Sequence, residues 1–444
     1  MFEYAACLPL CTMLTKAIYQ IFIYIYVAAA QFAALFNNKA AKWVAGRKNL
    51  WNQIDSALPG MATKKRVWVH CASLGEFEQG RPVIEAIKQQ YPDVLILLTF
   101  FSPSGFEVRK NYPFADAVWY LPADTPGNAR RFVETVNPGL VIFVKYEFWF
   151  NYLQLLQKNK IPIFLISAVF RPGQFFFRWY GSGFRKMLET YRMIYVQNIK
   201  SEQLLQHAKG LQVKTAVAPD TRFDRVQAAA LEAKTVITVE QFAAGRQLFI
   251  CGSTWPQDEQ LLARFIQQAP HEVAFVIAPH KIGKMQLSGL VKTLEGTGSI
   301  LYSEAIGQPD FADVASKYRV LIVDNIGLLL HIYRYGSYAY IGGGFGAGIH
   351  NILEAAVFGL PLFFGPRYSK FNEAVYLIGA GGAFSVGSTK ELLQQFTRLY
   401  DNRTAYLQAA SICKSYVEQN AGGTRIILEG LRPYLTPTET AEKQ

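Results

Sequence analysis

Short, uninterrupted apolar runs recur along most of the chain, and amphipathic stretches separate them. Runs such as Val67–Cys71, Val94–Phe101 and Leu140–Lys145 are rich in β-branched and aromatic residues, which is typical of buried strands. The stretch after Pro82 instead carries apolar residues at helical spacing. Continuous apolar strands that alternate with helices predict a parallel sheet covered by helices on both faces.

The expected strands fall into two sets. The first set is expected at residues 67–71, 94–101, 117–121, 140–145, 161–166 and 193–197, and it ends near 213–218. The second set is expected at residues 248–251, 272–278, 320–323, 338–341 and 360–364. Since 444 residues are too many for one ordinary core, we predict an α/β fold with two Rossmann-like domains and a cleft between them. The expected boundaries are 38–227 for the first domain, 228–247 for an Ala-rich, polar linker and 248–444 for the second domain.

The segment Ala17–Phe36 has no charged residue, and roughly 20 apolar residues can cross a bilayer as a helix. Its tyrosines and glutamines also suit a helix in the membrane interface, and a buried core helix is a third interpretation. We favour a membrane anchor over residues 1–37. Basic residues follow between positions 39 and 48, so the positive-inside rule places the rest of the chain in the cytoplasm. The residues before Met13 have no evident role, which makes Met13 an alternative start.

The charge balance favours acidic partners. The chain has 45 Lys and Arg against 33 Asp and Glu, a formal charge of +12, which suits anionic lipid headgroups or phosphorylated small molecules. The basic residues are spread without a dense run, so we expect no nucleic-acid partner. The five cysteines show no CxxC pair and no zinc-ligand spacing. We therefore expect no metal site and a reducing compartment.

Carboxylates follow two expected strands of the first domain. The segment Ser73–Glu78 contains Glu76 and Glu78, at the strand end where open α/β sheets bind ligands. Acidic residues in a first helical turn also stabilise the helix, so a binding site and a helix cap both remain open. Glu147 lies between aromatic residues after another strand, where an acid is costly to bury without a partner. Arg222, near the end of this domain, would by itself be an ordinary surface base.

A glycine-rich loop at residues 342–348 follows a strand of the second domain. Gly344, Gly346 and Gly348 are similar to part of the dinucleotide-binding fingerprint, although no acid follows at the expected interval. Backbone N–H groups at such a loop and helix start can also hold a phosphate, and a tight structural turn is the remaining interpretation.

Polar residues follow other strands of the second domain and are expected at the same crevice. Asn351 and Glu354 lie three residues apart on one helix face, where Glu354 can accept hydrogen bonds from ribose hydroxyls. His280 alone is an ordinary surface histidine, but beside the glycine loop it is a candidate phosphate ligand. The segment Asp324–Gly327 ends a further strand.

Taken together, these residues resemble the Kdo transferases of lipopolysaccharide biosynthesis, which add deoxy-manno-octulosonic acid to lipid A precursors. The resemblance extends from the apolar N-terminal segment to about Arg425. The elements that carry it, in the family's order, are Ala72–Glu78, Tyr146–Trp149, Gly252–Thr254, Ala278–His280, Asp324–Gly327, and His350–Ala356 leading to Phe364–Pro366.

The resemblance implies a GT-B glycosyltransferase that moves Kdo from CMP-Kdo to a lipid A precursor with inversion, without a metal or other cofactor. Its general base falls on Glu76, and its two assisting residues fall on Glu147 and Arg222. Its CMP-binding residues fall on Pro279, His280, Ile326, Gly327, Leu328, Asn351, Ile352, Leu353 and Glu354. It further implies an inner-membrane enzyme with its catalytic domains in the cytoplasm, in contact with anionic lipids.

The chain departs from the family pattern at several positions. The family commonly has Pro-Arg-His where this chain has Pro279-His280-Lys281, so the basic contact to the phosphate would move to Lys281. Tyr146 replaces a threonine, and the family often has Gly-Asn-x-Lys where Arg222 ends the corresponding segment here. Leu328 stands where an acid is often found. The alternatives are a membrane-associated GT-B enzyme with a UDP donor, a non-catalytic nucleotide-binding membrane protein, and a dehydrogenase that binds NAD.

Overall fold

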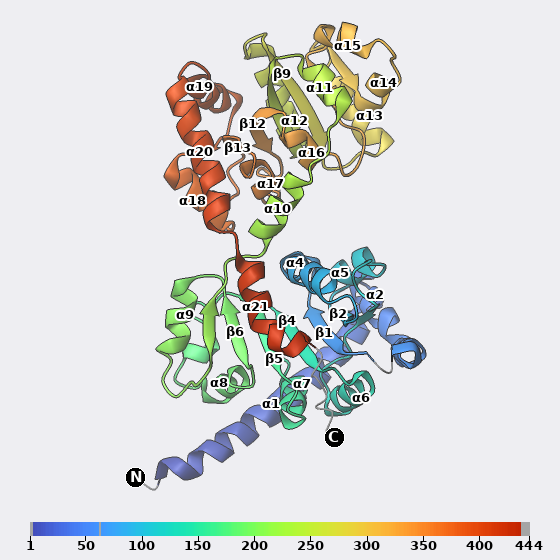
Figure 1. Ribbon diagram of the computed structural model, residues 1–444, viewed down its shortest axis with the longest axis vertical. Coiled ribbons are helices and arrows are strands. Elements are labelled where there is room, and N and C mark those ends of the chain that lie inside the picture. Colours follow the sequence, from blue (N-terminus) through green and yellow to red (C-terminus); the bar gives the residue numbers. More distant parts are fainter. Residues whose placement is uncertain (1–2, 62–63, 437–444) are drawn as a thin grey trace, which may run out of the picture. The chain divides into compact units, whose positions relative to one another are not determined.

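The computed structural model describes residues 3–61 and 64–436, with side chains from residue 16 onward, and it divides into two compact units (Figure 1). The first unit contains the chain up to Asp224 and the residues from Ala421, and the second contains Arg225–Asn420. Each unit is built on its own seven-stranded parallel sheet. The prediction of two Rossmann-like domains is therefore confirmed.

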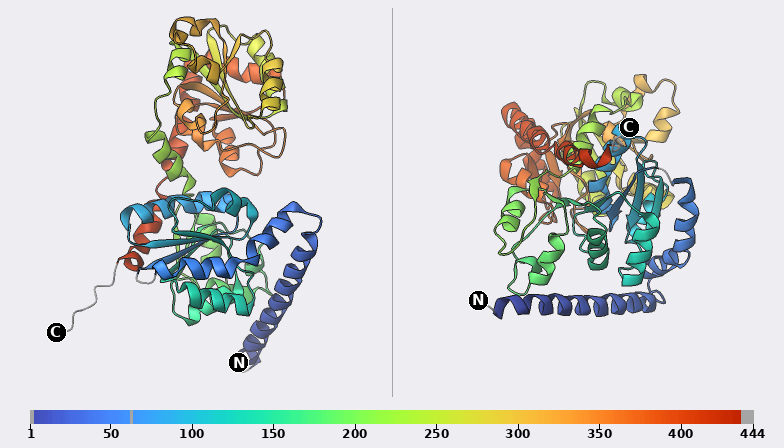
Figure 2. Two further views of the ribbon diagram at one scale, coloured as in Figure 1. Left: turned by 90° about the vertical axis from the view of Figure 1, so that its right-hand side faces the viewer. Right: turned by 60° about the horizontal axis from the view of Figure 1, so that its bottom comes forward.

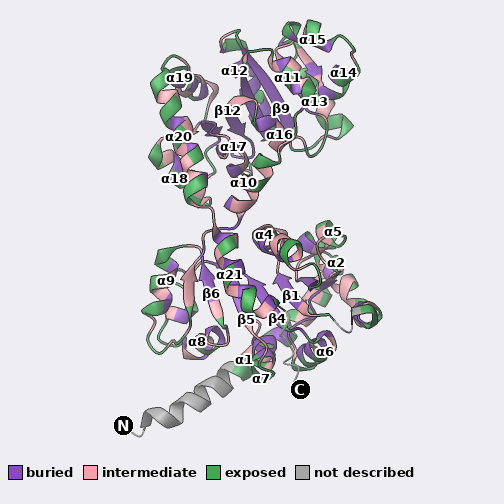
Figure 3. Ribbon diagram, in the orientation of Figure 1, coloured by how far each residue is buried: buried purple, intermediate pink, exposed green. Residues whose placement is uncertain are grey.

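The first sheet has the strand order β3-β2-β1-β4-β5-β6-β7. Its strands are β1 (Arg66–Cys71), β2 (Leu95–Phe100), β3 (Ala117–Tyr120), β4 (Leu140–Val144), β5 (Ile163–Ala168), β6 (Met193–Val196) and β7 (Thr215–Val217). Strand β1 shows why the apolar runs are continuous: Trp68 packs into the core on one face of the sheet, whereas Val67 and Val69 pack into the core on the other. The strand is buried on both faces (Figure 3), so no alternation of apolar and polar residues is needed.

Helices cover both faces of the first sheet. They are α1 (Glu3–Ala33), α2 (Asn38–Lys48), α3 (Leu50–Ala57), η1 (Pro59–Met61), α4 (Leu74–Gln90), α5 (Pro103–Arg109), α6 (Pro126–Val136), α7 (Phe150–Lys158), η2 (Phe175–Phe177), α8 (Ser182–Leu188) and α9 (Ile199–Gln206). Residues of α10 (Arg222–Leu231) belong to both units.

The C-terminal helix α21 (Gly423–Leu435) belongs to the first unit, although the sequence placed residues 248–444 in the second domain. Ile427 and Leu431 lie in the same core cluster as Val67 and Val69. The start of the helix is tied to the first unit by Asp224, whose carboxylate accepts hydrogen bonds from backbone N–H groups at Gly422 and Thr424. The boundary was wrong because the chain returns to its first domain.

The second sheet has the order β10-β11-β9-β8-β12-β13-β14. Its strands are β8 (Gln247–Thr254), β9 (Val273–Pro279), β10 (Ser299–Leu301), β11 (Val320–Ile322), β12 (Gly336–Ile341), β13 (Leu362–Phe364) and β14 (Ala383–Ser385). The other elements are α11 (Ile237–Ala243), α12 (Pro256–Gln268), α13 (Lys284–Thr293), α14 (Tyr302–Ile306), α15 (Phe311–Val314), η3 (Ala315–Lys317), α16 (Leu329–Tyr333), α17 (Leu353–Ala356), α18 (Asn372–Ala380), α19 (Thr389–Tyr400) and α20 (Arg403–Gln419).

The segment expected as a linker, 228–247, is instead folded into the second unit. It contains the end of α10 and all of α11, and Val239 and Phe242 of α11 are buried. The backbone N–H of Val236 donates to the Tyr335 hydroxyl at 2.9 Å. Its alanines and polar residues therefore form helices, because both have good helix propensity.

Helix α1 lies along the first unit (Figure 2). Tyr19 donates to Asp124 Oδ2 at 2.6 Å, the Gln20 amide donates to Asn151 Oδ1 at 2.6 Å, and Ile23 is buried. The opposite side is exposed and apolar, at Ile18, Ile21, Phe22, Tyr24, Ile25 and Phe32. Among the described residues, Lys16–Ala33 is the one helix long and apolar enough to cross a membrane by length and composition. The side chain of Met13, the suggested alternative start, lies outside the described side chains.

Each sheet has one point where the strand order reverses. In the first sheet it lies between β1 and β4, and in the second it lies between β8 and β12. Two crossovers leave in opposite directions there, so the loops after the two strands diverge and leave a crevice in which α/β proteins bind ligands.

Candidate active site

Glu76 stands at the reversal point of the first sheet, in the first turn of α4 directly after β1. Its side chain is half-buried, and its Oε2 accepts a hydrogen bond of 3.0 Å from the Ser73 hydroxyl. Ser73 is the residue before the helix, but its side chain caps no backbone N–H. The two side chains bond to each other, so no side-chain hydrogen bond caps the helix, although Glu76 stands in its first turn, where the helix dipole favours an acid.

Glu147 follows β4, the neighbouring strand at the same reversal point, and it is almost completely buried. Its Oε2 lies 3.0 Å from His70 Nε2 and accepts a hydrogen bond from the Trp149 indole. His70 Nε2 makes no well-aligned hydrogen bond, so its approach to Glu147 is a close polar contact. The other ring nitrogen of His70, Nδ1, lies 2.8 Å from Thr99 Oγ1. The acid between aromatic residues is therefore paired, which offsets the cost of burial.

The two carboxylates interact electrostatically. The pKa of Glu76 is raised, first by burial and next by the neighbouring charge of Glu147, while His70 and Lys145 oppose the rise. Lys145, at the end of β4, has a positive φ of 77°. Backbone strain of this kind is concentrated at functional sites. A half-buried carboxylate with a raised pKa can take a proton from a hydroxyl near neutral pH.

The other charged residues of this region are paired elsewhere. Glu78 accepts a 2.9 Å hydrogen bond from Arg109 of α5, which separates it from Glu76 in role. Arg222 donates through Nε and Nη2 to Asp220 Oδ2, at 3.0 and 2.9 Å. Asp220 also accepts from the Gln79 amide of α4 at 3.0 Å. Arg222 is thus connected to the helix that carries Glu76 through Asp220 and Gln79.

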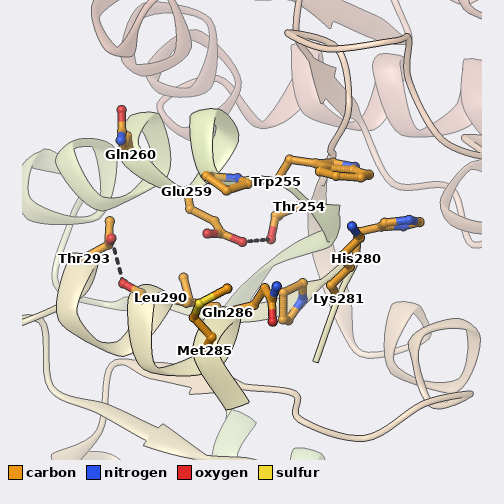
Figure 4. A pocket seen from close by; sticks show the side chains of 13 residues that line it. Thr254, Trp255, Glu259, Gln260, His280, Lys281, Met285, Gln286, Leu290 and Thr293 are labelled. Atoms are coloured by element: carbon orange, nitrogen blue, oxygen red, sulfur yellow. Dashed lines mark hydrogen bonds between the residues drawn. The ribbon is translucent and has the colours of Figure 1, made fainter. Parts of the chain in front are cut away.

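In the second unit, Trp255 and His280 lie at the ends of β8 and β9 (Figure 4), and His350 of the loop after β12 completes a stack of three rings. The His280 ring centroid lies 4.5 Å from that of Trp255 and 4.5 Å from that of His350. The Trp255 indole donates to His350 Nε2 at 3.0 Å. Pro279, His280 and Lys281 line a cavity of about 380 Å³ beside Trp255. Burial lowers the pKa of His280 and the charge of Lys281 lowers it further, so the imidazole is neutral at pH 7 and positive charge comes from Lys281.

The glycine loop is held by a buried acid that sequence reasoning did not assign. Asp258, in the first turn of α12, accepts hydrogen bonds from the Tyr340 hydroxyl at 2.8 Å and from the Gly343 N–H at 2.9 Å. The N–H groups of Gly346 and Gly348 donate to the Gly343 carbonyl. These two N–H groups are therefore not available to a phosphate. In the loop 344–348, the N–H groups of Gly344, Phe345 and Ala347 have no hydrogen-bond partner among the described residues.

Close packing also explains glycines in this loop. A Cβ on Gly344 would stand 2.6 Å from the Gly365 backbone, so the two loops after β12 and β13 touch through their main chains. The structural-turn interpretation is therefore correct for part of the loop.

The other predicted nucleotide contacts differ in accessibility. Asn351 is exposed, and its amide donates to Glu354 Oε1 at 3.0 Å. Ile352 and Leu353 are buried in the core, and Ile326 is 80% exposed. Gly327 has a φ of +89°, and it lies with Leu328 in the turn after β11. Only four residues, Leu353–Ala356, form helix α17, which is shorter than the sequence pattern indicated.

Within residues 16–61 and 64–436, no group of three or more His, Cys, Asp or Glu side chains is arranged to hold a metal ion. Cys71, Cys251 and Cys413 are buried free thiols. Cys7 and Cys11 lie outside the described side chains.

Solved structures that are similar to this chain share its two-domain architecture. A UDP-GlcNAc 2-epimerase from Neisseria meningitidis has a TM-score of 0.56 at 17% identity, and the match covers 83% of this chain and 100% of that one. A UDP-N-acetylglucosamine 2-epimerase from Listeria monocytogenes has a TM-score of 0.54 at 12% identity, over 86% and 99% of the two chains. At these identities the likeness concerns the fold alone, and it is the fold of GT-B enzymes.

The sequence relatives are more specific. Residues 47–225 match the family model described as 3-deoxy-D-manno-octulosonic-acid transferase. The 3-deoxy-D-manno-octulosonic acid transferase of Aquifex aeolicus is 28% identical over 76% of this chain and 86% of its own length. Those of Haemophilus influenzae and Bordetella pertussis are 23% and 25% identical, each over 83% of this chain and 87% of theirs. The chain is therefore similar to the 3-deoxy-D-manno-octulosonic acid (Kdo) transferases over most of its length, and it is a glycosyltransferase with the GT-B fold.

Proposed function

We propose that this Kdo transferase moves Kdo from CMP-Kdo to a hydroxyl of a lipid A precursor of the lipid IVA type, with inversion at the anomeric carbon. The observation that carries the proposal is the Glu76 carboxylate: half-buried, bonded to Ser73 and raised in pKa at the reversal point of the first sheet. Together with the family, this position makes Glu76 the candidate general base.

In the proposed step, the acceptor hydroxyl gives its proton to Glu76 as its oxygen forms a bond to the anomeric carbon of Kdo. The bond between that carbon and the phosphate oxygen breaks, and CMP leaves with the electron pair. Attack from the side opposite to CMP inverts the configuration. Glu147 raises the basicity of Glu76, because a second negative charge makes protonation of Glu76 more favourable, whereas His70, the partner of Glu147, opposes this effect.

Arg222 acts in this proposal as an assisting residue. Its guanidinium is held by Asp220, which is bonded to Gln79 on the helix that carries Glu76. These bonds connect the Arg222 guanidinium to α4, the helix that carries Glu76. From there its positive charge can stabilise the negative charge that develops on the leaving CMP.

For the donor, we propose that the second unit binds CMP at the stacked rings and at the glycine loop. Lys281 supplies positive charge for the phosphate, and its Nζ lies 5.4 Å from the Trp255 ring centroid. The N–H groups of Gly344, Phe345 and Ala347 are the backbone donors that remain for the phosphate. The pair of exposed Asn351 and half-buried Glu354 is suited to ribose hydroxyls. Ile352 and Leu353 would contribute through their backbone, because their side chains are buried.

We further propose that α1 lies in the inner-membrane interface and does not cross the bilayer. Its contact side is fixed by hydrogen bonds from Tyr19 and Gln20 to the first unit, and its other side is apolar. A helix that crosses the bilayer would separate Tyr19 and Gln20 from their partners and leave both side chains without them in hydrocarbon. An interfacial helix keeps these bonds and buries its apolar side in lipid. Anionic lipids and a cytoplasmic location of the catalytic units agree with the basic residues after Asn37.

The test is the reaction of the full chain with CMP-Kdo and a defined tetra-acylated, bisphosphorylated lipid A precursor. Mass spectrometry of the lipid is expected to show addition of one or more Kdo residues, together with stoichiometric CMP release. No mass increase with this pair would overturn the proposal. The rival with a UDP donor predicts that UDP, and not CMP, raises the melting temperature of the protein.

A further inference from the structure

The first unit has a second cavity that the proposed mechanism does not use. Its volume is about 1070 Å³, and its walls come from the segment after β5, from η2 and from α9. None of its lining residues was singled out by the sequence, because they lie on loops and on exposed helix faces.

The cavity is strongly cationic. Arg171, Arg178, Arg185, Lys200 and Lys209 line it, and no carboxylate does. Arg185 is occupied, since its guanidinium donates to the Phe176 and Arg178 carbonyls at 2.8 and 3.3 Å. The other four basic side chains form no ion pair or hydrogen bond with the described residues. Unneutralised cations gathered in a concave surface attract a multiply charged anion.

The same cavity carries exposed aromatic rings. Trp179 is 93% exposed, and the neighbouring Tyr180 is 53% exposed. Their rings meet edge to face at 5.5 Å. Large exposed rings beside cations suit a ligand that has both apolar and anionic parts, such as a phosphorylated lipid.

The cavity adjoins the catalytic region. Phe148, the residue after Glu147, packs edge to face on Phe176 of the cavity wall, with centroids 4.7 Å apart. Arg171 is close enough to Tyr146, the residue before Glu147, to oppose the rise of its pKa. On the other side, α8 packs against both η2 and α1, the helix with the exposed apolar side. One wall thus packs on Phe148, next to Glu147 in the chain, and α8, which carries Arg185 of the cavity, packs on the apolar helix α1.

We infer that this cavity binds a phosphate of the glycolipid acceptor, with Arg171 and Arg178 as the principal contacts and Trp179 against the sugar or the first acyl carbons. The inference rests on the proposed function and adds the specificity determinant for its acceptor. The acceptor's apolar part stays in the membrane along α1, and its reacting hydroxyl is directed past Phe148 toward Glu76.

The test compares Arg171→Ala/Arg178→Ala with the control Lys110→Ala/Arg130→Ala, which removes two exposed charges elsewhere on the same unit. With the bisphosphorylated acceptor, the first variant is expected to raise the acceptor KM by roughly ten-fold or more, because charge-assisted hydrogen bonds to phosphate are lost. The KM for CMP-Kdo and the melting temperature are expected to match those of the control. Lys200→Glu, at an exposed position on α9, provides a second variant if the double variant fails to fold.

Two further arms identify the source of the phosphate. With a dephosphorylated acceptor, the acceptor KM of the wild type is expected to rise. The acceptor KM of the variants is then expected to be no higher than that of the wild type. Co-sedimentation with phosphatidylglycerol vesicles is expected to be the same in variant and control. Inorganic phosphate is expected to inhibit the control more than the variant, because it competes with the acceptor phosphate for the arginines. An acceptor KM that is unchanged in both Arg171→Ala/Arg178→Ala and Lys200→Glu would overturn the inference. A variant that loses vesicle binding but keeps its acceptor KM would also overturn it. No transfer by the wild type would instead overturn the proposed function.

Discussion

His70 Nε2 lies 3.0 Å from Glu147 Oε2, and the two side chains are 0% and 2% exposed. They come from β1 and β4, adjacent strands at the point where the first sheet reverses its order. Glu76 lies just after β1, the strand that contains His70. The buried polar pair therefore lies beside the half-buried carboxylate that is proposed as the base.

Replacement of His70 by leucine is expected to destabilise the fold by about 1–3 kcal/mol, because Glu147 would stay buried without its close polar partner. Urea unfolding measures the change. His271→Leu, at an exposed position, is the control and is expected to change stability by less than about 0.5 kcal/mol. Equal stability of the two variants would show that the pair contributes nothing.

Glu76→Ala is expected to lower CMP release by about 100-fold or more, because the acceptor hydroxyl loses its general base. CMP binding, measured by calorimetry, is expected to stay unchanged. Glu78→Ala is the matched control on the same helix turn. Its carboxylate is paired with Arg109, so transfer is expected to remain within about three-fold of wild type. Retained turnover in Glu76→Ala would exclude Glu76 as the base.

The pH dependence of kcat/KM is expected to show its acid limb above the ordinary range of a glutamate. The pKa of Glu76 is raised by burial and then by Glu147, and a base is inactive below its pKa. Glu147→Gln removes the second cause, so the acid limb is expected to move to lower pH, whatever happens to the maximal rate. A limb at the same pH in both enzymes would show that Glu147 does not act on the titrating group.

Asp124 links the stability of the fold to pH. Burial raises the pKa of this carboxyl to about 7, and it accepts a hydrogen bond from Tyr19 of α1. Because the folded-state pKa is above the unfolded value of about 3.9, the native state binds more protons in this window. The contribution of Asp124 therefore becomes more favourable as pH falls from about 7 toward about 4. The stability difference between wild type and Asp124→Asn, measured by urea unfolding from pH 8 to pH 5, is expected to move in favour of wild type as pH falls.

Lys281→Ala is expected to weaken CMP binding by roughly ten-fold, because the neutral His280 cannot replace its charge at the phosphate. Isothermal titration with CMP measures the loss, and the wild-type affinity is expected to fall more steeply with salt than that of the variant. Lys284→Ala, at an exposed position nearby on α13, should bind CMP like wild type. Identical affinities for both lysine variants would move the phosphate contact elsewhere.

Much of the fold is a local property of this sequence. Buried parallel strands need continuous apolar runs, so β1, β2 and β4 are visible in the linear pattern. The three-residue strands β10 and β14 were not predicted, because they form the edges of the second sheet and lack such runs. Candidate site residues could be found where a motif follows a strand, as for Glu76 and His280. The roles of His70 and Asp258 were not predicted. In the sequence, His70 is one residue of an apolar strand, and Asp258 is an ordinary acid in the first turn of a helix.

The sequence by itself determined the two α/β domains, the strand ends that carry the chemistry and the family resemblance. Only the tertiary structure decided that β1 pairs with β4, which brings His70 and Glu147 together, and that α21 returns to the first unit. It also decided which side of α1 bonds to Asp124. The physical reason is the same in each case: strand order, helix docking and the choice of a hydrogen-bond partner depend on segments far apart in the chain, whose contacts leave no period or spacing in the linear pattern.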